Sequence, residues 1–191
     1  AADVVVNAAS ADHKGAVVAL LDALAGSGKP FIHTSGSSIV GTRPKGERSD
    51  AIFDEDTPIT PSLARAARVA LNESILSYRD KGCRPVIICP SLIYGAGLGA
   101  NPNSVQVPLL VKLAKKRGNA AHAGPGENVW SNVHIDDLVP LYALAIEKAP
   151  AGGFYFVENG EHSMREACVA INRMLGFAGP PTVMSMAEAA A

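Results

Sequence analysis

A run of small hydroxyl residues and glycine at positions 34–41 is the part of the sequence best suited to chemistry. The run, Thr-Ser-Gly-Ser-Ser-Ile-Val-Gly, follows directly after the apolar residues Phe31 and Ile32. In an α/β protein such a change of composition marks the carboxyl end of a parallel strand, where ligands bind. Hydroxyl groups and backbone amides could form the floor of a ligand site there. The structural alternative is a serine- and glycine-rich loop that only ends a strand.

Alternating strands and helices position this run. Unbroken apolar stretches predict strands covered on both faces, and helical spacing of apolar residues predicts the helices between them. The strands are predicted at 4–6, from 31 into the hydroxyl run, and at 85–89, with helices at 14–25 and 62–80. A Pro- and Gly-bearing surface loop is predicted at 42–61. This alternation predicts a parallel α/β sheet with right-handed crossovers.

The pattern changes after Gly95. Helices are predicted near 104–117 and at 137–148, and a short strand at 154–157. Ser163 and Glu166 have the spacing of a capping box and predict the start of a last helix that ends at Gly176. These elements predict a small carboxyl-terminal α/β lobe.

Composition excludes several classes of function. The 191 residues are 48% hydrophobic, which is enough for a sizeable core. A formal charge of −1 gives no electrostatic footprint for nucleic acid or for an anionic membrane, so small molecules or proteins are the expected partners. Cys83, Cys89 and Cys168 lack CxxC spacing, which favours a reducing cytoplasm over a disulfide framework or a zinc site. No apolar stretch is long enough to cross a membrane.

Four segments together resemble the extended short-chain dehydrogenase/reductase superfamily, and within it the NAD-dependent epimerase/dehydratase family. They are the strand at 3–9, the serine-bearing strand at 34–41, the Pro-x-x-x-Tyr-Gly turn at 84–95 and the His-x-Asp-Asp segment at 133–138. The resemblance implies a Rossmann-like, doubly wound parallel sheet. Residues 1–95 would form a partial NAD(P)-binding domain. Residues 96–191 would mostly form the substrate lobe, with segments that return to the core.

The resemblance also implies the residues of the site, with NAD or NADP as the cofactor. The implied cofactor-binding residues lie at three strand ends: Asn7, Ala8, Ala9, Thr34, Ser35, Gly36, Pro90, Ser91, Leu92 and Ile93. Gly36 stands where the family's catalytic Ser or Thr is usual, so Ser35 or Ser37 would polarise a substrate oxygen.

A small sugar-, nucleotide-sugar- or polyol-like substrate would face Tyr94, Gln106, Trp130 and His134. Structural roles remain open for two of these residues. His134 could fix the turn before the next helix, and Trp130 could anchor a core.

The sequence departs from the family pattern in two ways. It contains no Gly-x-x-Gly-x-x-Gly, and it opens inside a strand without methionine, so we expect a fragment that lacks the Gly-rich βαβ unit. None of its four tyrosines has a lysine four residues later. Counting back from Glu73 puts Arg65 at the family's tyrosine position and Val69 at its lysine position, and arginine is a poor general acid.

Two functions from different classes follow. The first is an atypical NAD(P)-dependent oxidoreductase or epimerase. The second is a non-catalytic dinucleotide-binding or protein-interaction module. The resemblance further implies a homodimer through helices 14–25 and 62–80, where Ala66, Ala67 and Ala70 would allow close approach.

Overall fold

The apolar runs form a four-stranded parallel sheet in the computed structural model, which describes residues 2–42, 45–99 and 101–190. In spatial order the strands are β1 (Val5–Asn7), β2 (Pro30–Thr34), β3 (Arg84–Pro90) and β7 (Gly153–Val157). All three pairings are parallel. Nearly every residue of β2 and β3 is buried, as strands covered on both faces require.

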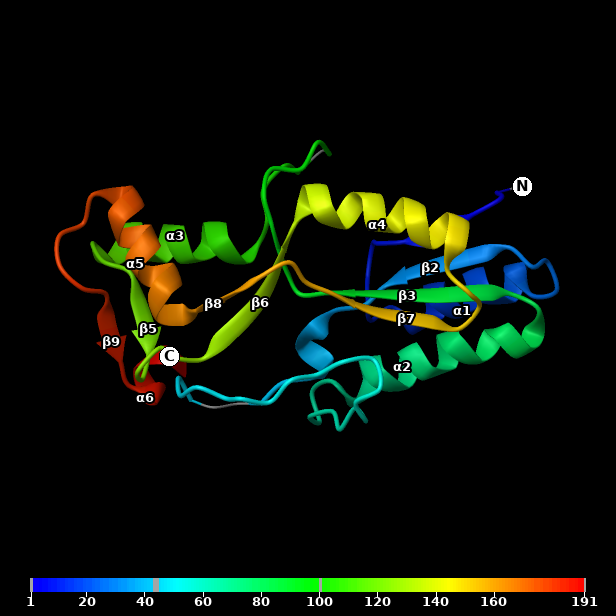
Figure 1. The fold of residues 1–191 in the computed structure, drawn as a ribbon, viewed down its shortest axis with the longest axis horizontal. Coiled ribbons are helices and arrows are strands. Elements are labelled where there is room, and N and C mark those ends of the chain that lie inside the picture. Colours follow the sequence, from blue (N-terminus) through cyan, green and yellow to red (C-terminus); the bar gives the residue numbers. More distant parts are fainter. Residues whose placement is uncertain (1, 43–44, 100, 191) are drawn as a thin grey trace. The chain divides into compact units, whose positions relative to one another are not determined.

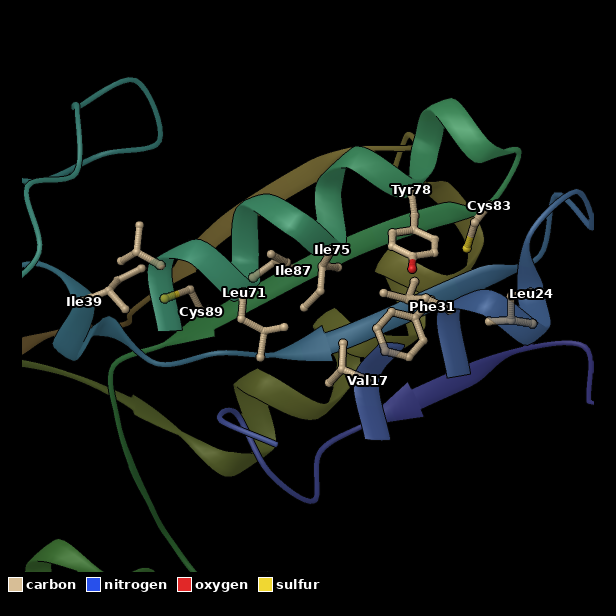
Figure 2. Packing of buried hydrophobic residues seen from close by; sticks show 12 residues of the cluster. Val17, Leu24, Phe31, Ile39, Leu71, Ile75, Tyr78, Cys83, Ile87 and Cys89 are labelled. Atoms are coloured by element: carbon tan, nitrogen blue, oxygen red, sulfur yellow. The ribbon is translucent and has the colours of Figure 1, made fainter. Parts of the chain in front are cut away.

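Helices cover both faces of this sheet. The helices α1 (Lys14–Leu24) and α2 (Ala66–Ser77) pack on one face, and α4 (Ile135–Lys148) lies on the other (Figure 1). Side chains such as Val17, Ile75 and Ile87 fill the space between the two helices and the sheet (Figure 2). The predicted doubly wound α/β class is therefore confirmed.

The predicted helix at 62–80 is shorter than expected. Residues 62–65 form a turn, because the Ser62 carbonyl accepts hydrogen bonds from the Arg65 and Ala66 amides at 2.8 and 3.0 Å. After α2 the chain tightens into the 3₁₀ helix η2 (Tyr78–Lys81) and stops at Gly82. Gly82 has a φ of 70°, and a Cβ there would lie 3.1 Å from the Gly26 Cα. Both the backbone angle and the close approach therefore require glycine.

Contacts divide the described chain into two units. The first contains residues 2–41, 53–91 and 136–157, and the second contains residues 42–52, 92–135 and 158–190, without the undescribed positions. The loop predicted at 42–61 is thus shared between the units, and Arg43 and Pro44 within it lie outside the described residues. Over the described residues, no helix combines the length and apolar character that crossing a membrane would need.

Short strands and three helices form the second unit. The strands β4 (Leu92–Tyr94), β6 (Val129–His134) and β8 (Glu161–Ser163) make one sheet, and β5 (Ala121–Ala123) pairs with β9 (Thr182–Met184). The helices are α3 (Gln106–Arg117), α5 (Met164–Leu175) and α6 (Met186–Ala190). The capping box predicted at Ser163 and Glu166 is present at the start of α5.

His33 is a polar residue inside the core of the first unit. It is 0% exposed, and its Nδ1 lies 3.0 Å from the Asn7 amide nitrogen, which makes Nδ1 the acceptor. Burial lowers the pKa of His33 to about 4, so the ring is neutral at pH 7. Because the unfolded chain then binds a proton more readily than the folded chain, acid favours unfolding.

We therefore predict a pH-dependent stability that belongs to His33. As the pH is lowered from 6.5 to 4, His33 should lower the free energy of unfolding by at most about 3 kcal/mol. The variant His33→Leu should lack this part of the pH dependence of the unfolding free energy, measured by urea unfolding at several pH values. The control is His13→Asn, which changes an exposed histidine and keeps a side chain suited to its N-cap position. Equal slopes in wild type and His33→Leu would contradict the prediction.

Candidate functional site

The carboxyl ends of the parallel strands coincide at one edge of the first unit's sheet. The register pairs Asn7 with His33, Thr34 with Ile88, and Pro90 with Val157. This edge therefore carries the predicted residues Asn7, 34–36, Pro90 and Ser91. Ala8 and Ala9 follow β1 and are exposed.

The two candidate serines differ in accessibility. Ser35 is only 7% exposed, and its Oγ accepts a 2.9 Å hydrogen bond from the buried Asn72 amide on α2. The Ser35 hydroxyl also contacts the Cys89 thiol, whose pKa burial raises to about 12. Ser37 is partly exposed and begins the 3₁₀ helix η1 (Ser37–Ile39). Of the two, Ser37 is therefore better placed to meet a ligand.

Arg68 of α2 brings a positive charge to the same edge. It donates to the two Asp12 carboxylate oxygens at 2.7 and 2.6 Å, and its Nη1 donates to Ser38 Oγ at 3.2 Å. The hydrogen-bonded guanidinium lowers the pKa of Asp12, and the carboxylate raises the pKa of Arg68. The Arg68 side chain is 14% exposed and that of Asp12 is 60% exposed, so a partly buried guanidinium pairs with a carboxylate at the surface.

Glycine at position 36 lets the Arg68 guanidinium lie close to the backbone. A Cβ on Gly36 would lie 3.3 Å from Arg68 Nη1, which is tighter than an ordinary contact. Neither Arg68 nor Asp12 is among the residues predicted from the sequence. Two features of the sequence could have pointed to these residues. One is an arginine directly before Val69, which stands at the expected lysine position, and the other is an acidic residue shortly after β1.

The two residues expected at the family's tyrosine and lysine positions lie at the start of α2. Val69 is 7% exposed and belongs to the apolar cluster under α2, and Arg65 is the N-cap residue of that helix. A different tyrosine lies at the strand edge. The Tyr142 hydroxyl of α4 is 2.6 Å from Thr34 Oγ1, and burial raises the pKa of Tyr142. Tyr142 therefore stays protonated and orients the Thr34 hydroxyl.

Three buried polar atoms at or near the strand ends lack hydrogen-bond partners among the described residues. They are His33 Nε2, Asn72 Oδ1 and Ser91 Oγ. Buried polar groups are normally paired, so such atoms are available to a bound group or to water. Ser91 follows β3 directly, at the segment expected to pass the nicotinamide.

The remaining predicted residues belong to the second unit, and the structure brings two of them together. Tyr94 and His134 are register partners on β4 and β6, with ring centroids 5.0 Å apart in an edge arrangement. Trp130 lies on β6 and is 39% exposed. Leu92 and Ile93 lie on β4, and Gln106 is exposed at the first turn of α3.

Several curated proteins are similar to this chain. An uncharacterized protein of Saccharomyces cerevisiae is 35% identical over 141 residues, which cover 73% of this chain and 43% of that protein. The oxidase ucsJ of an Acremonium species is 32% identical over 204 residues, which cover 90% of this chain and 58% of that protein. A 2-alkyl-3-oxoalkanoate reductase of Stenotrophomonas maltophilia is 31% identical over 124 residues, which cover 62% of this chain and 35% of that protein. The chain thus spans about half, or less, of the length of these relatives.

Solved structures show the same fold at lower identity. The dTDP-glucose 4,6-dehydratase of Bacillus anthracis, in complex with NAD, has a TM-score of 0.77 and 22% identity, covering 96% of this chain and 60% of that chain. The UDP-glucose 4-epimerase of Thermotoga maritima, with UDP-glucose, has a TM-score of 0.72 and 16% identity, covering 96% and 64%.

A family model gives the assignment directly. The model described as the NAD dependent epimerase/dehydratase family matches residues 3–157, which is well over half of the chain. The match includes β1, β2, β3 and β7, whose ends carry the candidate site. The chain belongs to the NAD-dependent epimerase/dehydratase family.

Proposed function

We propose that the protein is an NAD(P)-dependent oxidoreductase that moves a hydride between a nicotinamide and a carbonyl or hydroxyl carbon of a small substrate. Family membership supports the cofactor. The observation that carries the proposal is the Arg68 guanidinium, which is hydrogen-bonded to Asp12 and lies close to Gly36. When bound, NAD or NADP would supply or accept the hydride.

The residues at the strand ends fit such a cofactor. Asn7, Thr34 and Ser91 offer amide and hydroxyl groups, and Ser91 Oγ is buried without a partner among the described residues. Gly36 and the exposed Ala8 and Ala9 are small, which allows a flat ring or a phosphate to approach the backbone. We assign cofactor binding to these residues.

Arg68 would provide the electrostatic stabilisation that a tyrosine–lysine pair provides elsewhere in the family. A guanidinium stays charged and is a poor proton donor, so its role is to stabilise negative charge on the substrate oxygen during hydride transfer. Asp12 engages Nε and Nη2 and so orients the group, which leaves Nη1 toward Gly36 and Ser38. Ser37, adjacent to Ser38, would relay the proton from water to that oxygen.

Two substrate classes are compatible with this chemistry. The family resemblance implies a sugar, nucleotide sugar or polyol, and two similar structures are those of a dTDP-glucose 4,6-dehydratase and a UDP-glucose 4-epimerase. The Stenotrophomonas relative is by its name a reductase of a 2-alkyl-3-oxoalkanoate, which is a ketone with an alkyl chain and a carboxylate. Tyr94, Gln106, Trp130 and His134 are the residues proposed to face either substrate.

A non-catalytic dinucleotide-binding or interaction module is the second candidate. It is favoured by the absence of any tyrosine with a lysine four residues later and by the burial of Val69 in the core. Such a module would bind NADH or NADPH without turnover of any carbonyl compound.

We also propose a cytoplasmic homodimer that uses α1 and α2. Ala66, Ala67 and Ala70 are exposed on α2, and Leu20 of α1 is 37% exposed. Small exposed residues permit close helix packing. A monomer mass at every concentration in light scattering would overturn this proposal.

The role of Arg68 predicts the behaviour of one variant. Arg68→Met should lower kcat/KM for NADPH-dependent carbonyl reduction by about 10²–10³-fold, because it removes charge stabilisation of the substrate oxygen. The affinity for NADPH in a fluorescence titration should change little. The measurement is the loss of nicotinamide absorbance with a panel of aldoses, polyols and 3-oxo acids.

Arg79→Met is the matched control, because Arg79 is on η2, its side chain is 57% exposed and its Nε lies 3.7 Å from Asp80 Oδ1. Circular dichroism establishes that each variant is folded. Full turnover by Arg68→Met would refute its role. NADPH binding without turnover by wild type on the whole panel would favour the non-catalytic module.

A further inference from the structure

A groove in the second unit is lined by sulfur, aromatic and aliphatic side chains. Its volume is about 450 Å³, within the range of small-molecule sites. Met164, Met184 and Met186 line it together with Trp130 and Leu110. These are three of the four methionines of the chain, drawn from the start of α5, the end of β9 and the start of α6. Flexible, polarisable thioethers adapt to aliphatic chains of different shape.

One fully charged side chain joins these apolar walls. Among the described residues that line the groove, Lys45 is the only lysine, arginine, aspartate or glutamate. The polar remainder includes the Asn128 amide and His122, whose Nδ1 is 3.0 Å from the Gly124 carbonyl. Since a carbonyl only accepts, His122 Nδ1 is the donor of this hydrogen bond. The groove therefore combines an apolar surface with one cation.

Lys45 is held in place by its neighbour Gly46. The Gly46 carbonyl accepts hydrogen bonds from the Glu127 and Asn128 amides at 2.7 and 3.2 Å. Lys45 itself has a φ of 53°, which is uncommon for a residue with a side chain. A Cβ on Gly46 would lie 2.2 Å from the Ala123 carbonyl oxygen, so only glycine allows this approach. The backbone that carries the ammonium group is thus fastened to the turn between β5 and β6.

We propose that this groove binds a monocarboxylate with an aliphatic chain, with the chain against the methionines and Trp130 and the carboxylate at Lys45. The proposal rests on the proposed oxidoreductase function, in which such a 3-oxo or 3-hydroxy acid would be the substrate. A nucleoside diphosphate sugar fits the groove less well. Its two phosphates and sugar hydroxyls would meet one cation and mostly apolar walls, and polar groups buried without partners are costly.

Trp130 gives a direct readout, because it is the only tryptophan of the 191-residue chain. Titrations with hexanoate, octanoate and decanoate below micelle-forming concentrations should change its fluorescence. The affinity should rise about three- to fourfold for each added methylene group that becomes buried. Decanol, decyltrimethylammonium and UDP-glucose are the comparison ligands, and each should bind more weakly than decanoate.

Two variants separate the contribution of the lysine charge to binding from that of the apolar contact with the ligand's alkyl chain. Lys45→Met should weaken decanoate about two- to fivefold, remove its advantage over decanol and keep the dependence on chain length. Met164→Gln should weaken all chain lengths, because it places an amide in the apolar wall. Lys112→Met is the matched control for the loss of a lysine, since Lys112 is exposed on α3 and does not line the groove.

Several outcomes would overturn the proposal. These are equal affinities for hexanoate and decanoate, tighter binding of decyltrimethylammonium or UDP-glucose, and a fluorescence change that follows protein concentration, which would indicate a second copy in the groove. The titration needs no cofactor. If it fails while NADPH-dependent carbonyl reduction persists, the groove assignment falls and the oxidoreductase function stands.

Discussion

The parallel register of β1, β2 and β3 is the constraint on which the candidate site depends. Because the three strands run in one direction and end together, residues far apart in sequence meet at a single edge. The same edge receives α2, so Arg68 can reach Asp12 after β1 and Ser38 after β2. Without this alignment the serines and glycine that follow β2 would be an ordinary loop.

In the proposed function, the ion pair between Asp12 and Arg68 would give this edge a chemistry that differs from the usual pattern of the family. A tyrosine–lysine pair supplies both a proton and a positive charge, whereas a guanidinium supplies only the charge. In the proposed mechanism, proton transfer would use the Ser37 hydroxyl, whereas the Tyr142 hydroxyl is hydrogen-bonded to Thr34. The fold would then be retained while the catalytic roles of its residues change.

The strands of the main sheet could be predicted from the sequence because local composition determines them. Unbroken apolar runs such as 85–89 mark strands buried on both faces, and the capping box at Ser163 marks a helix start. The two-stranded sheet of β5 and β9 was not predicted, since each strand has three residues and their pairing joins Ala121 to Thr182, far away in sequence.

The site was less accessible to sequence analysis than the fold. The strand-end residues were selected from family motifs, and their roles remain predictions. Arg68 was missed because its importance arises from a contact with Asp12, 56 positions earlier, that no local pattern encodes. The split of the 42–61 loop between two units, and the arrangement of three separate methionines around Trp130, likewise depend on long-range packing.

The most direct test of the account is the fate of the hydride. The protein would be incubated with NADPH, or NADH, deuterated on either face of the nicotinamide C4, together with carbonyl substrates, and the products analysed by mass spectrometry. The account predicts that one face transfers deuterium to the carbinol carbon of a product. Bound nucleotide with no deuterated product from any carbonyl class would contradict it and leave a dinucleotide-binding module.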